Sequence, residues 1–246
     1  MSRSSKPLGL LVGTSLLETD FGTNLQKRTI ETDREPVPVH YTENLVVVQR
    51  HDSPTGYRAP HAIDHQSNLL ALKQLEVETI VAVNSTGSLR KDVTPGTIVV
   101  PDDFINPWEP VTFHDDDGGH GVSQFDPELR DVLVTTVRNT VSQFRTEATY
   151  LQTRGPRFET PAEARMFAEY ADVVGMTAAS EVTLACELDI PYATVCMVDN
   201  YVNGIAGSRV DMESFEESVA KNVPTVKNLV STLIENEFDL DTEALL

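Results

Sequence analysis

Short apolar runs alternate with helical patterns along the chain, and this alternation constrains the fold more than any other feature of the sequence. The runs are rich in Val and Ile, which favour buried strands. They predict strands over Leu8–Gly13, Leu45–Arg50, Thr79–Asn84, Thr97–Val100, Ala148–Thr153, Asp172–Gly175 and Tyr192–Asp199. The stretches between them predict helices over His61–Leu75, Pro127–Val141, Pro161–Tyr170, Ala179–Leu188 and Met212–Glu235. We therefore expect an α/β fold with a mixed central sheet flanked by helices.

The pattern shows no linker and no internal repeat, so we expect a single domain over residues 1–246 with a frayed acidic tail over roughly 236–246. Pro161 suits the first turn of a helix, and Asp211 suits an N-cap. Pro224 lies inside the last predicted helix and should kink or split it. The segments 18–42 and 102–126 are predicted to be irregular.

The charge of the chain argues against several classes of function. It carries 38 acidic and 19 basic residues, for a formal net charge of −19. Such a chain repels phosphate backbones and anionic lipids, so we expect no nucleic-acid partner and no membrane attachment. A strongly acidic surface also suits high cytoplasmic salt, which screens self-repulsion. No apolar run is long enough to span a bilayer, and two cysteines cannot form a disulfide framework. We expect a cytoplasmic protein.

Small and polar residues follow several predicted strands, where α/β sheets bind their ligands. These segments are Gly13-Thr14-Ser15, Arg50-His51, the turn expected at Asn84–Ser88, and Gly175-Met176-Thr177. Hydroxyls, a guanidinium and close backbone approach suit a phosphate dianion. Each segment alone is more often a turn, a helix cap or a surface loop than part of an anion site. Four of them at one sheet edge predict an anion site.

Other common sites lack their signatures. The chain contains neither G-x-x-x-x-G-K-[ST] nor G-x-G-x-x-G, so a P-loop is excluded and a dinucleotide site has no fingerprint. His61 and His65 stand four residues apart on one predicted helix, a spacing that can bind zinc. No third ligand or adjacent Glu accompanies them, so we expect no metal.

Two long motifs are the most specific part of the sequence: Gly155–Glu163 (GPRFETPAE) and Gly175–Val182 (GMTAASEV). On these motifs the chain resembles the trimeric purine nucleoside phosphorylases and the related methylthioadenosine phosphorylases, from Leu8 to the last helix. The resemblance implies the phosphorylase-type fold and the phosphorolysis of a purine nucleoside to free purine and ribose 1-phosphate. It also implies a homotrimer or homohexamer with no cofactor, because inorganic phosphate is a co-substrate.

The resemblance implies roles for single positions of this sequence. Phosphate contacts are implied for Thr14, Arg50, His51, Asn84, Ser85 and Thr177. Contacts with the nucleoside are implied for Phe158, Glu159, Met176, Asn200, Tyr201, Val202 and Met212. Phe158 would pack on the purine and Met176 against the ribose. Asn200 is the expected catalytic residue and would face N7 and the 6-substituent.

The chemistry of the reaction fits these residue types. Cleavage of the N-glycosidic bond builds positive charge on the ribosyl ring and negative charge on the purine. A phosphate under the ring then acts as nucleophile and counter-charge, while fixed donors stabilise the leaving purine. The reaction needs neither a protein nucleophile nor a metal.

Two positions bear on the choice of base. The Glu159 carboxylate can accept from N1–H and the 2-amino group of a 6-oxopurine, and the Asn200 amide can donate to O6 or N7. The pair favours guanosine or inosine, although Glu159 is also explained as a carboxylate near a helix N-terminus. Met212 corresponds to the position near the 5′ group, where an apolar residue would accept a methylthio substituent. Methylthioinosine and methylthioadenosine are therefore alternatives, and Met212 is equally well explained as a core residue.

Several positions depart from the family pattern: Ser15, Asp52, Asp199 and Val202. Ser15 and Asp52, the latter a carboxylate near the expected phosphate site, fit a second hypothesis, a nucleoside-binding protein without turnover. A third hypothesis is a hydrolase, against which Arg50 and Thr177 argue, because a hydrolase gains nothing from a phosphate site. The aromatic segment Phe104–Phe113 is a candidate for closing the pocket of a neighbouring subunit.

Overall fold

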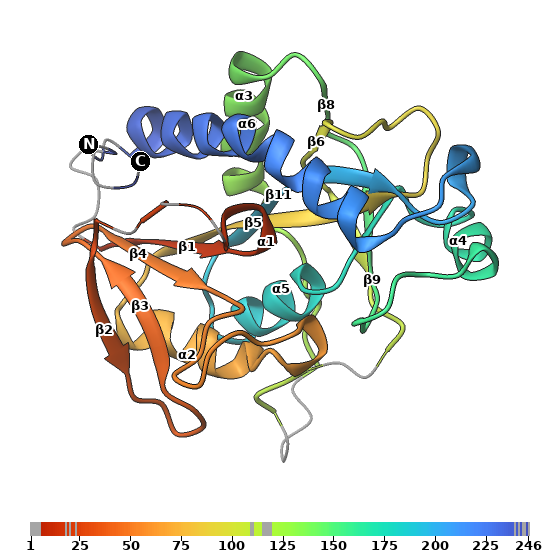
Figure 1. Cartoon of the computed structure of the whole chain (residues 1–246). Helices are drawn as coiled ribbons and strands as arrows, with labels where there is room; N and C mark the ends of the chain where they lie inside the picture. Colours follow the sequence, from red (N-terminus) through yellow and green to blue (C-terminus); the bar gives the residue numbers. More distant parts are fainter. Residues whose placement is uncertain are drawn as a thin grey trace.

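The computed structural model describes residues 6–17, 19, 21–22, 24–108, 111–114, 120–238, 240, 242 and 245. Within them a mixed sheet runs through the chain, with helices against both of its faces (Figure 1). The strands are β1 (Leu8–Val12), β2 (Gln26–Ile30), β3 (Val37–Tyr41), β4 (Leu45–Gln49), β5 (Thr79–Ser88), β6 (Ile98–Val99), β7 (Asp103–Ile105), β8 (Phe144–Arg145), β9 (Thr149–Gln152), β10 (Val173–Gly175) and β11 (Tyr192–Tyr201). The helices are α1 (Thr14–Leu17), α2 (His65–Gln74), α3 (Pro127–Thr140), α4 (Pro161–Phe167), α5 (Ala178–Glu187) and α6 (Met212–Phe238), with short 3-10 turns η1 (Pro60–Ala62) and η2 (Ile205–Gly207). The expected mixed α/β architecture is confirmed.

Strand β5 is the centre of the sheet. It pairs in parallel with β1 on one side and β11 on the other, and its last residues pair antiparallel with β10. The sheet extends from β5 through β1, β4, β3 and β2 in one direction and through β10, β9 and β7 in the other, while β11 carries β6 and β8. The residues that follow β1 and β4 therefore lie at the same edge of the sheet as the last residues of β5 and β11.

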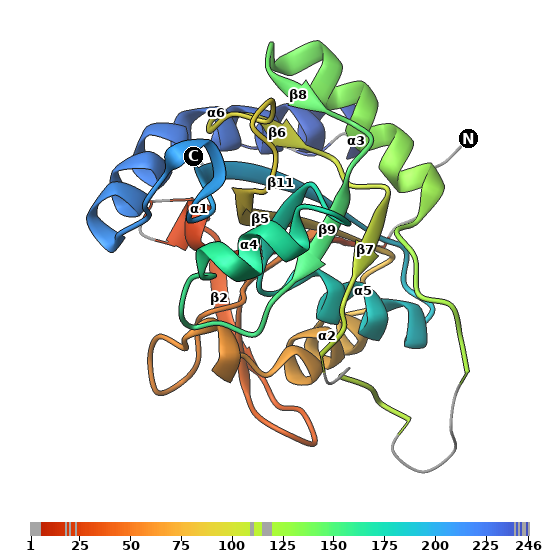
Figure 2. The same ribbon diagram turned by 90° about the vertical axis from the view of Figure 1, so that its right-hand side faces the viewer.

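The core lies on both faces of the sheet because its strands alternate. On β5, Val81 and Val83 pack with residues of α3 and α6, while Ile80 and Ala82 pack with residues of α2 and α5. Figures 1 and 2 show α3 and α6 on one face and α2 and α5 on the other. Both faces of the central strands are buried, which explains why these strands appear in the sequence as continuous apolar runs.

Most predicted elements agree with the structure, but the short strands β7 and β8 were not predicted, and α2 begins at His65 rather than at His61. Two further differences are larger. The strand predicted to end at Asn84 continues to Ser88, because β10 and β11 supply hydrogen-bonding partners for these polar residues. The segment 18–42, predicted to be irregular, contains the antiparallel pair β2–β3. Most of β2 is exposed, so it lacks the apolar signal of a core strand.

The helix ends follow the predicted chemistry. The Asp211 carboxylate accepts from the Ser214 amide at 2.9 Å, and Pro161 occupies the first turn of α4. Pro224 does not split α6, which continues from Met212 to Phe238, although Figure 1 shows the first part of this helix bent down toward the sheet edge. The described part of the tail is not frayed: α6 continues to Phe238, Leu245 is buried in the core, and Leu240 packs against it.

Candidate active site

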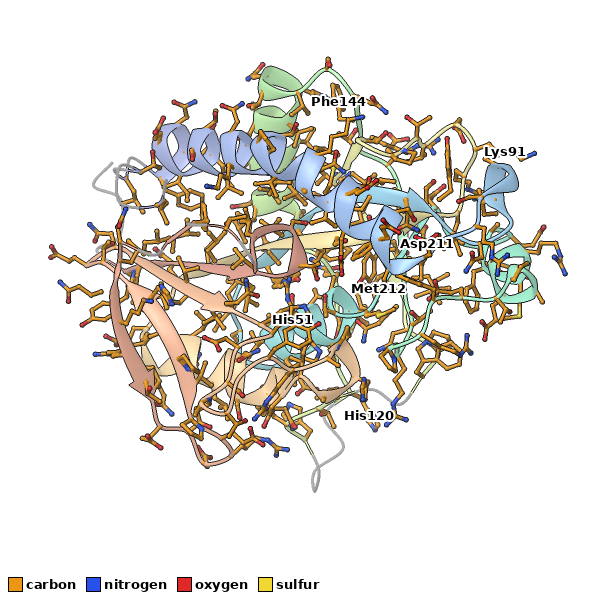
Figure 3. All side chains as sticks on the ribbon, in the orientation of Figure 1. His51, Lys91, His120, Phe144, Asp211 and Met212 are labelled. Atoms are coloured by element: carbon orange, nitrogen blue, oxygen red, sulfur yellow. The ribbon has the colours of Figure 1, made fainter. Side chains whose placement is uncertain are left out.

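A cavity of about 800 Å³ opens at this sheet edge, with the first half of α6 as one wall. The segments after β1, β4 and β10 contribute to it, together with the ends of β5 and β11. Figure 3 labels His51 after β4 and Met212 at the start of α6, which come from two of these segments. The sequence-predicted residues that line the cavity are Thr14, Arg50, His51, Asn84, Ser85, Phe158, Glu159, Met176, Thr177, Asn200 and Met212. The structure thus brings most of the expected site together.

Tyr201 and Val202 do not line the cavity. Side chains alternate along β11, so the neighbour of Asn200 points elsewhere: the Tyr201 hydroxyl donates to the carbonyl of Lys91, which Figure 3 shows well away from His51. Val202 is 2% exposed and packs behind the cavity against the backbone of Gly87. Both side chains belong to the packing that supports the site rather than to its lining.

The Arg50 guanidinium is already satisfied by protein groups. Nε and Nη2 donate to the two carboxylate oxygens of Glu181 at 2.6 and 3.2 Å, and further bonds run from Nη1 to the Val83 carbonyl and from Nη2 to the Leu11 carbonyl. Arg50 is 2% exposed and Glu181 1%, so the ion pair is buried. The bidentate phosphate contact expected of Arg50 is therefore not preformed, because its two-pronged edge faces Glu181.

Gly13 explains how so large a side chain fits here. A Cβ on Gly13 would lie 2.2 Å from Arg50 Nη1, closer than any real contact. Only glycine lets the guanidinium pass beneath the loop that carries Thr14 and Ser15. Gly13 is therefore required by the buried arginine, whether or not a ligand binds.

His51 is neutral and presents an acceptor. Its Nδ1 lies 2.9 Å from the carbonyl of Arg58, which can only accept, so Nδ1 carries the proton and Nε2 a lone pair. Burial lowers the pKa of His51 to about 4. The ring stacks on Tyr57 at 5.3 Å between centroids. His51 thus suits a hydroxyl of a ligand better than a fully ionised oxygen.

Hydroxyl groups form the rest of the expected phosphate side. The Thr177 hydroxyl donates to the side chain of Asn84 at 2.7 Å, which in turn donates to Thr194. Ser15 is 2% exposed, and its hydroxyl has no hydrogen-bond partner among the described residues. A buried hydroxyl without a partner is unfavourable, so an oxygen-rich ligand would find a ready donor here.

Asp52 does not enter the cavity. It is exposed, and its carboxylate accepts from the Ser53 amide at 2.9 Å. The carboxylate that the sequence brings close to the phosphate site therefore faces a separate small hollow beside Arg58.

The opposite part of the cavity combines aromatic and hydrogen-bonding groups. Phe158 lies 5.7 Å from Phe215 of α6, measured between ring centroids. Glu159 accepts from the Thr153 hydroxyl at 2.8 Å, and burial raises the pKa of its carboxyl. The Asn200 amide donates to the Tyr201 carbonyl at 2.9 Å, which fixes its orientation at the cavity wall. A flat base with donor and acceptor edges matches this set.

The sequence prediction missed several lining residues. Tyr57, 63% exposed, stands at the cavity rim beside His51. Phe215, Val219 and Val223 extend the apolar wall that begins at Met212. Their helical spacing forms one stripe of α6, a signal that in sequence is indistinguishable from a core-facing stripe. Phe104 and Phe113 pack against the chain's own core, and the prediction that their segment closes the pocket of a neighbouring subunit stays untested.

No metal-binding group of three or more His, Cys, Asp or Glu occurs among the described residues. His61 and His65 do not share a helix, since His61 lies in η1 and His65 begins α2. His65 is buried, with Nδ1 3.8 Å from the Glu181 carboxylate. Among the described helices, none is both long and apolar enough to cross a membrane.

Comparison with known proteins agrees with this geometry. The chain is 34% identical over 238 residues to a probable 6-oxopurine nucleoside phosphorylase of Archaeoglobus fulgidus, covering 94% of this chain and 97% of the relative. It is 33% identical to a probable S-methyl-5′-thioinosine phosphorylase of Methanocaldococcus jannaschii, covering 94% and 93%. A crystal structure of methylthioadenosine phosphorylase from Schistosoma mansoni in complex with adenine shares the fold, with a TM-score of 0.80 at 23% identity, covering 96% of this chain and 93% of that one.

The family itself follows from the extent of the match. The model of the phosphorylase superfamily matches residues 8–235, which include every cavity-lining segment described above. The chain therefore belongs to the phosphorylase superfamily.

Proposed function

We propose that the chain catalyses the phosphorolysis of 6-oxopurine nucleosides such as guanosine and inosine to free purine and ribose 1-phosphate. One observation carries this proposal: a single cavity joins a hydroxyl-rich end to an end with an aromatic ring, a carboxyl and an amide. The hydroxyls of Thr14, Ser15 and Thr177 suit phosphate, and Glu159 with Asn200 suits the edge of a 6-oxopurine. A relative from Pyrococcus furiosus, 36% identical over 241 residues, carries the name 6-oxopurine nucleoside phosphorylase.

The reaction needs few protein groups. The C1′–N9 bond breaks, its electron pair leaves with the purine, and a phosphate oxygen forms a new bond to C1′. Asn200 stabilises the departing base by donating to N7 or O6, and Glu159 holds its N1–H edge. A fixed donor of this kind is worth about 3 kcal/mol of transition-state stabilisation. The departing purine takes up its proton from phosphate or water.

A second candidate substrate is methylthioinosine. The α6 wall of the cavity is apolar at Met212, Phe215, Val219 and Val223, and nothing in this stripe could hydrogen-bond a 5′-hydroxyl. Glu216 is the one carboxylate that α6 adds to the lining among the described residues. An apolar wall favours a methylthio group by removing it from water.

The direct test is an incubation of the protein with guanosine, inosine, adenosine, methylthioadenosine and methylthioinosine, with and without phosphate, in low and molar salt. Chromatography of the free base should show release from the 6-oxopurine nucleosides only when phosphate is present. Release without phosphate would identify a hydrolase. Tight nucleoside binding without release would identify a binding protein.

Thr177→Val is the sharper variant for the phosphate end. Arg50→Ala would leave Glu181 buried without its partner, so a lower activity could reflect a destabilised fold rather than weaker phosphate binding. Thr177→Val removes one hydroxyl whose proton, donated to the neutral Asn84 amide in this structure, would turn to a phosphate oxygen when phosphate binds. The variant should raise the KM for phosphate about tenfold with little effect on the KM for nucleoside. An unchanged KM for phosphate would remove Thr177 from the phosphate site.

We also propose that the chain forms a homotrimer or homohexamer. Trp108, Met166 and Tyr170 are exposed at 42, 56 and 71%, and Trp108 packs edge-on against Phe167 of α4. An apolar area of this kind favours contact with another subunit. Light scattering should report a trimer or hexamer, and Tyr170→Asp should lower the mass if this area is the interface.

A further inference from the structure

A buried carboxylate lies directly behind the cavity. Asp199 is 1% exposed and does not line the cavity. It sits where the register of β11 against β5 shifts between Val198 and Asn200, so it is the extra residue of a β-bulge. Because of the bulge, Asn200 lines the cavity while its neighbour Asp199 lies buried behind the cavity wall.

The carboxylate connects two walls of the cavity. Ser85 of β5, which lines the cavity, donates its hydroxyl proton to Asp199 Oδ2. Asn222 of α6 donates to Oδ1 at 2.8 Å, and the Ser218 hydroxyl of the same helix donates to the Asp199 backbone carbonyl. Because the Ser85 hydroxyl donates its one proton to Asp199, it can act only as an acceptor toward the cavity.

The groups that face Asp199 are uncharged. The contributors to its pKa are burial and the hydrogen bonds from Ser85 and Asn222, and no charged side chain among the described residues takes part. Strand β5 carries no ionisable side chain. The ionisable residues of α6 next to these contacts are exposed: Glu216, Glu217 and Lys221. In the loop before β6, Lys91 and Asp92 are exposed, and the half-buried Arg90 is paired with Asp172. The ionisable cavity residues beyond Ser85 are His51, Arg50, Tyr57, Glu159 and Glu216.

We propose that Asp199 is a positioning residue that controls phosphate affinity through the Ser85 hydroxyl. While Asp199 is ionised, the Ser85 proton points to it and away from the cavity. When Asp199 is neutral, its own proton is donated to Ser85, and the Ser85 proton turns to a phosphate oxygen. The inference rests on the proposed phosphate site, because Ser85 acts on whatever anion occupies that end of the cavity.

The burial of Asp199 makes this change accessible near neutral pH. Burial raises the pKa of its carboxyl to about 6, against the lowering effect of the two hydrogen bonds. For a given ionic form of phosphate, binding should therefore become tighter as the pH falls from about 7 to 5.

Asp199→Asn reproduces the neutral state. Asn222 donates to the Oδ1 position, so an Asn at 199 keeps its carbonyl oxygen there and turns its amide nitrogen to Ser85. Ser85 then accepts, and its proton is free for the cavity. The variant also removes a negative charge from beneath a bound anion, and it adds no volume.

The experiment measures the KM for phosphate from pH 5 to 7 in the wild type and in Asp199→Asn, with inosine saturating. A hydrogen bond to a charged oxygen is worth about tenfold in affinity at the low end of its range. Because roughly a tenth of the wild type is already neutral at pH 7, the variant should have a KM about sixfold lower there, and the ratio should approach one at pH 5. The ratio cancels the ionisation of phosphate itself. kcat and the KM for inosine should change by less than about twofold. A ratio that does not vary with pH, or a variant KM at or above that of the wild type, overturns the proposal.

Two controls distinguish the role of the Ser85 hydroxyl from a general effect of removing a negative charge. Asp172→Asn removes a carboxylate that pairs with Arg90 outside the cavity, and it should leave the KM for phosphate unchanged. In a Ser85→Ala background, Asp199→Asn should have no further effect, and an undiminished effect there would show that charge alone acts and refute the role of Ser85. If Thr177→Val raises the KM for phosphate while Asp199→Asn leaves it unchanged, only this inference fails. If neither changes it, the proposed phosphate site is wrong.

Discussion

The stability of the folded chain should also report the burial of Asp199. A pKa raised from 3.8 to about 6 means that the folded state binds this proton more tightly than the unfolded chain does. Below pH 3.8 the buried carboxyl therefore does not lower the free energy of unfolding. The loss of unfolding free energy grows as the pH rises to about 6 and is constant above that pH. At 1.36 kcal/mol per pH unit, the full cost is about 3 kcal/mol.

Asp199→Asn should remove that cost. Denaturant unfolding of the wild type and the variant should give nearly equal free energies at low pH, with the variant more stable by roughly half of the full cost at pH 5 and by about 3 kcal/mol at pH 8. Asp172→Asn is the matched control, because it removes a carboxylate whose partner Arg90 lies 2.8 Å away and should bring no gain. A difference between Asp199→Asn and wild type that stays flat from pH 5 to 8, or a less stable variant at pH 8, would refute the burial of an ionised carboxylate here.

Three further substitutions test the site. Glu181→Gln leaves the Arg50 guanidinium buried without its counter-charge and should cost about 3–5 kcal/mol of unfolding free energy; phosphate should then raise the Tm of the variant more than that of the wild type, and an equal rise would mean that the anion does not reach Arg50. Asn200→Asp should lower the inosine-to-adenosine ratio of kcat/KM by about tenfold, because a protonated carboxyl can donate to N7 and accept from a 6-amino group; an unchanged ratio would exclude Asn200 from base recognition. Met212→Asp should lower kcat/KM for methylthioinosine about fivefold relative to inosine, since about 1 kcal/mol of apolar contact is lost; equal losses for the two substrates would place Met212 away from the 5′ group.

The fold was predictable because its signal is local. The central strands are buried on both faces, so each appears as a Val- and Ile-rich run, and the helices between them have ordinary capping residues. The β2–β3 pair was missed because β2 is mostly exposed and polar. The strand continuation from Asn84 to Ser88 was missed because its polar residues are held by pairing with β10 and β11, which no local pattern encodes.

The cavity residues were predictable as a set, but their partners were not. The segments around Thr14, His51, Thr177 and Asn200 each follow or end a strand, and strand ends at one edge converge. The partner of Arg50 lies 131 residues away in sequence, so the ion pair with Glu181 could not be inferred from spacing. The resemblance implied contacts for Tyr201 and Val202, but alternation along β11 turns Tyr201 away from the face of Asn200. Val202 lies past the end of the strand and packs against Gly87 instead.

The electrostatics of the cavity explain how a strongly acidic chain can hold an anion without a free cation. Arg50 is neutralised by Glu181, and His51 is kept neutral by burial. What remains at this end is a group of hydroxyl donors whose direction is set by neighbouring acceptors, as Thr177 is set by Asn84 and Ser85 by Asp199. Affinity for phosphate then depends on how many of these protons can be turned into the cavity. The affinity of such a site for phosphate rises when a neighbouring acceptor is neutralised. For a given ionic form of phosphate, the proposed site should therefore bind more tightly in acid, although no described side chain lining the cavity gains a positive charge between pH 7 and 5.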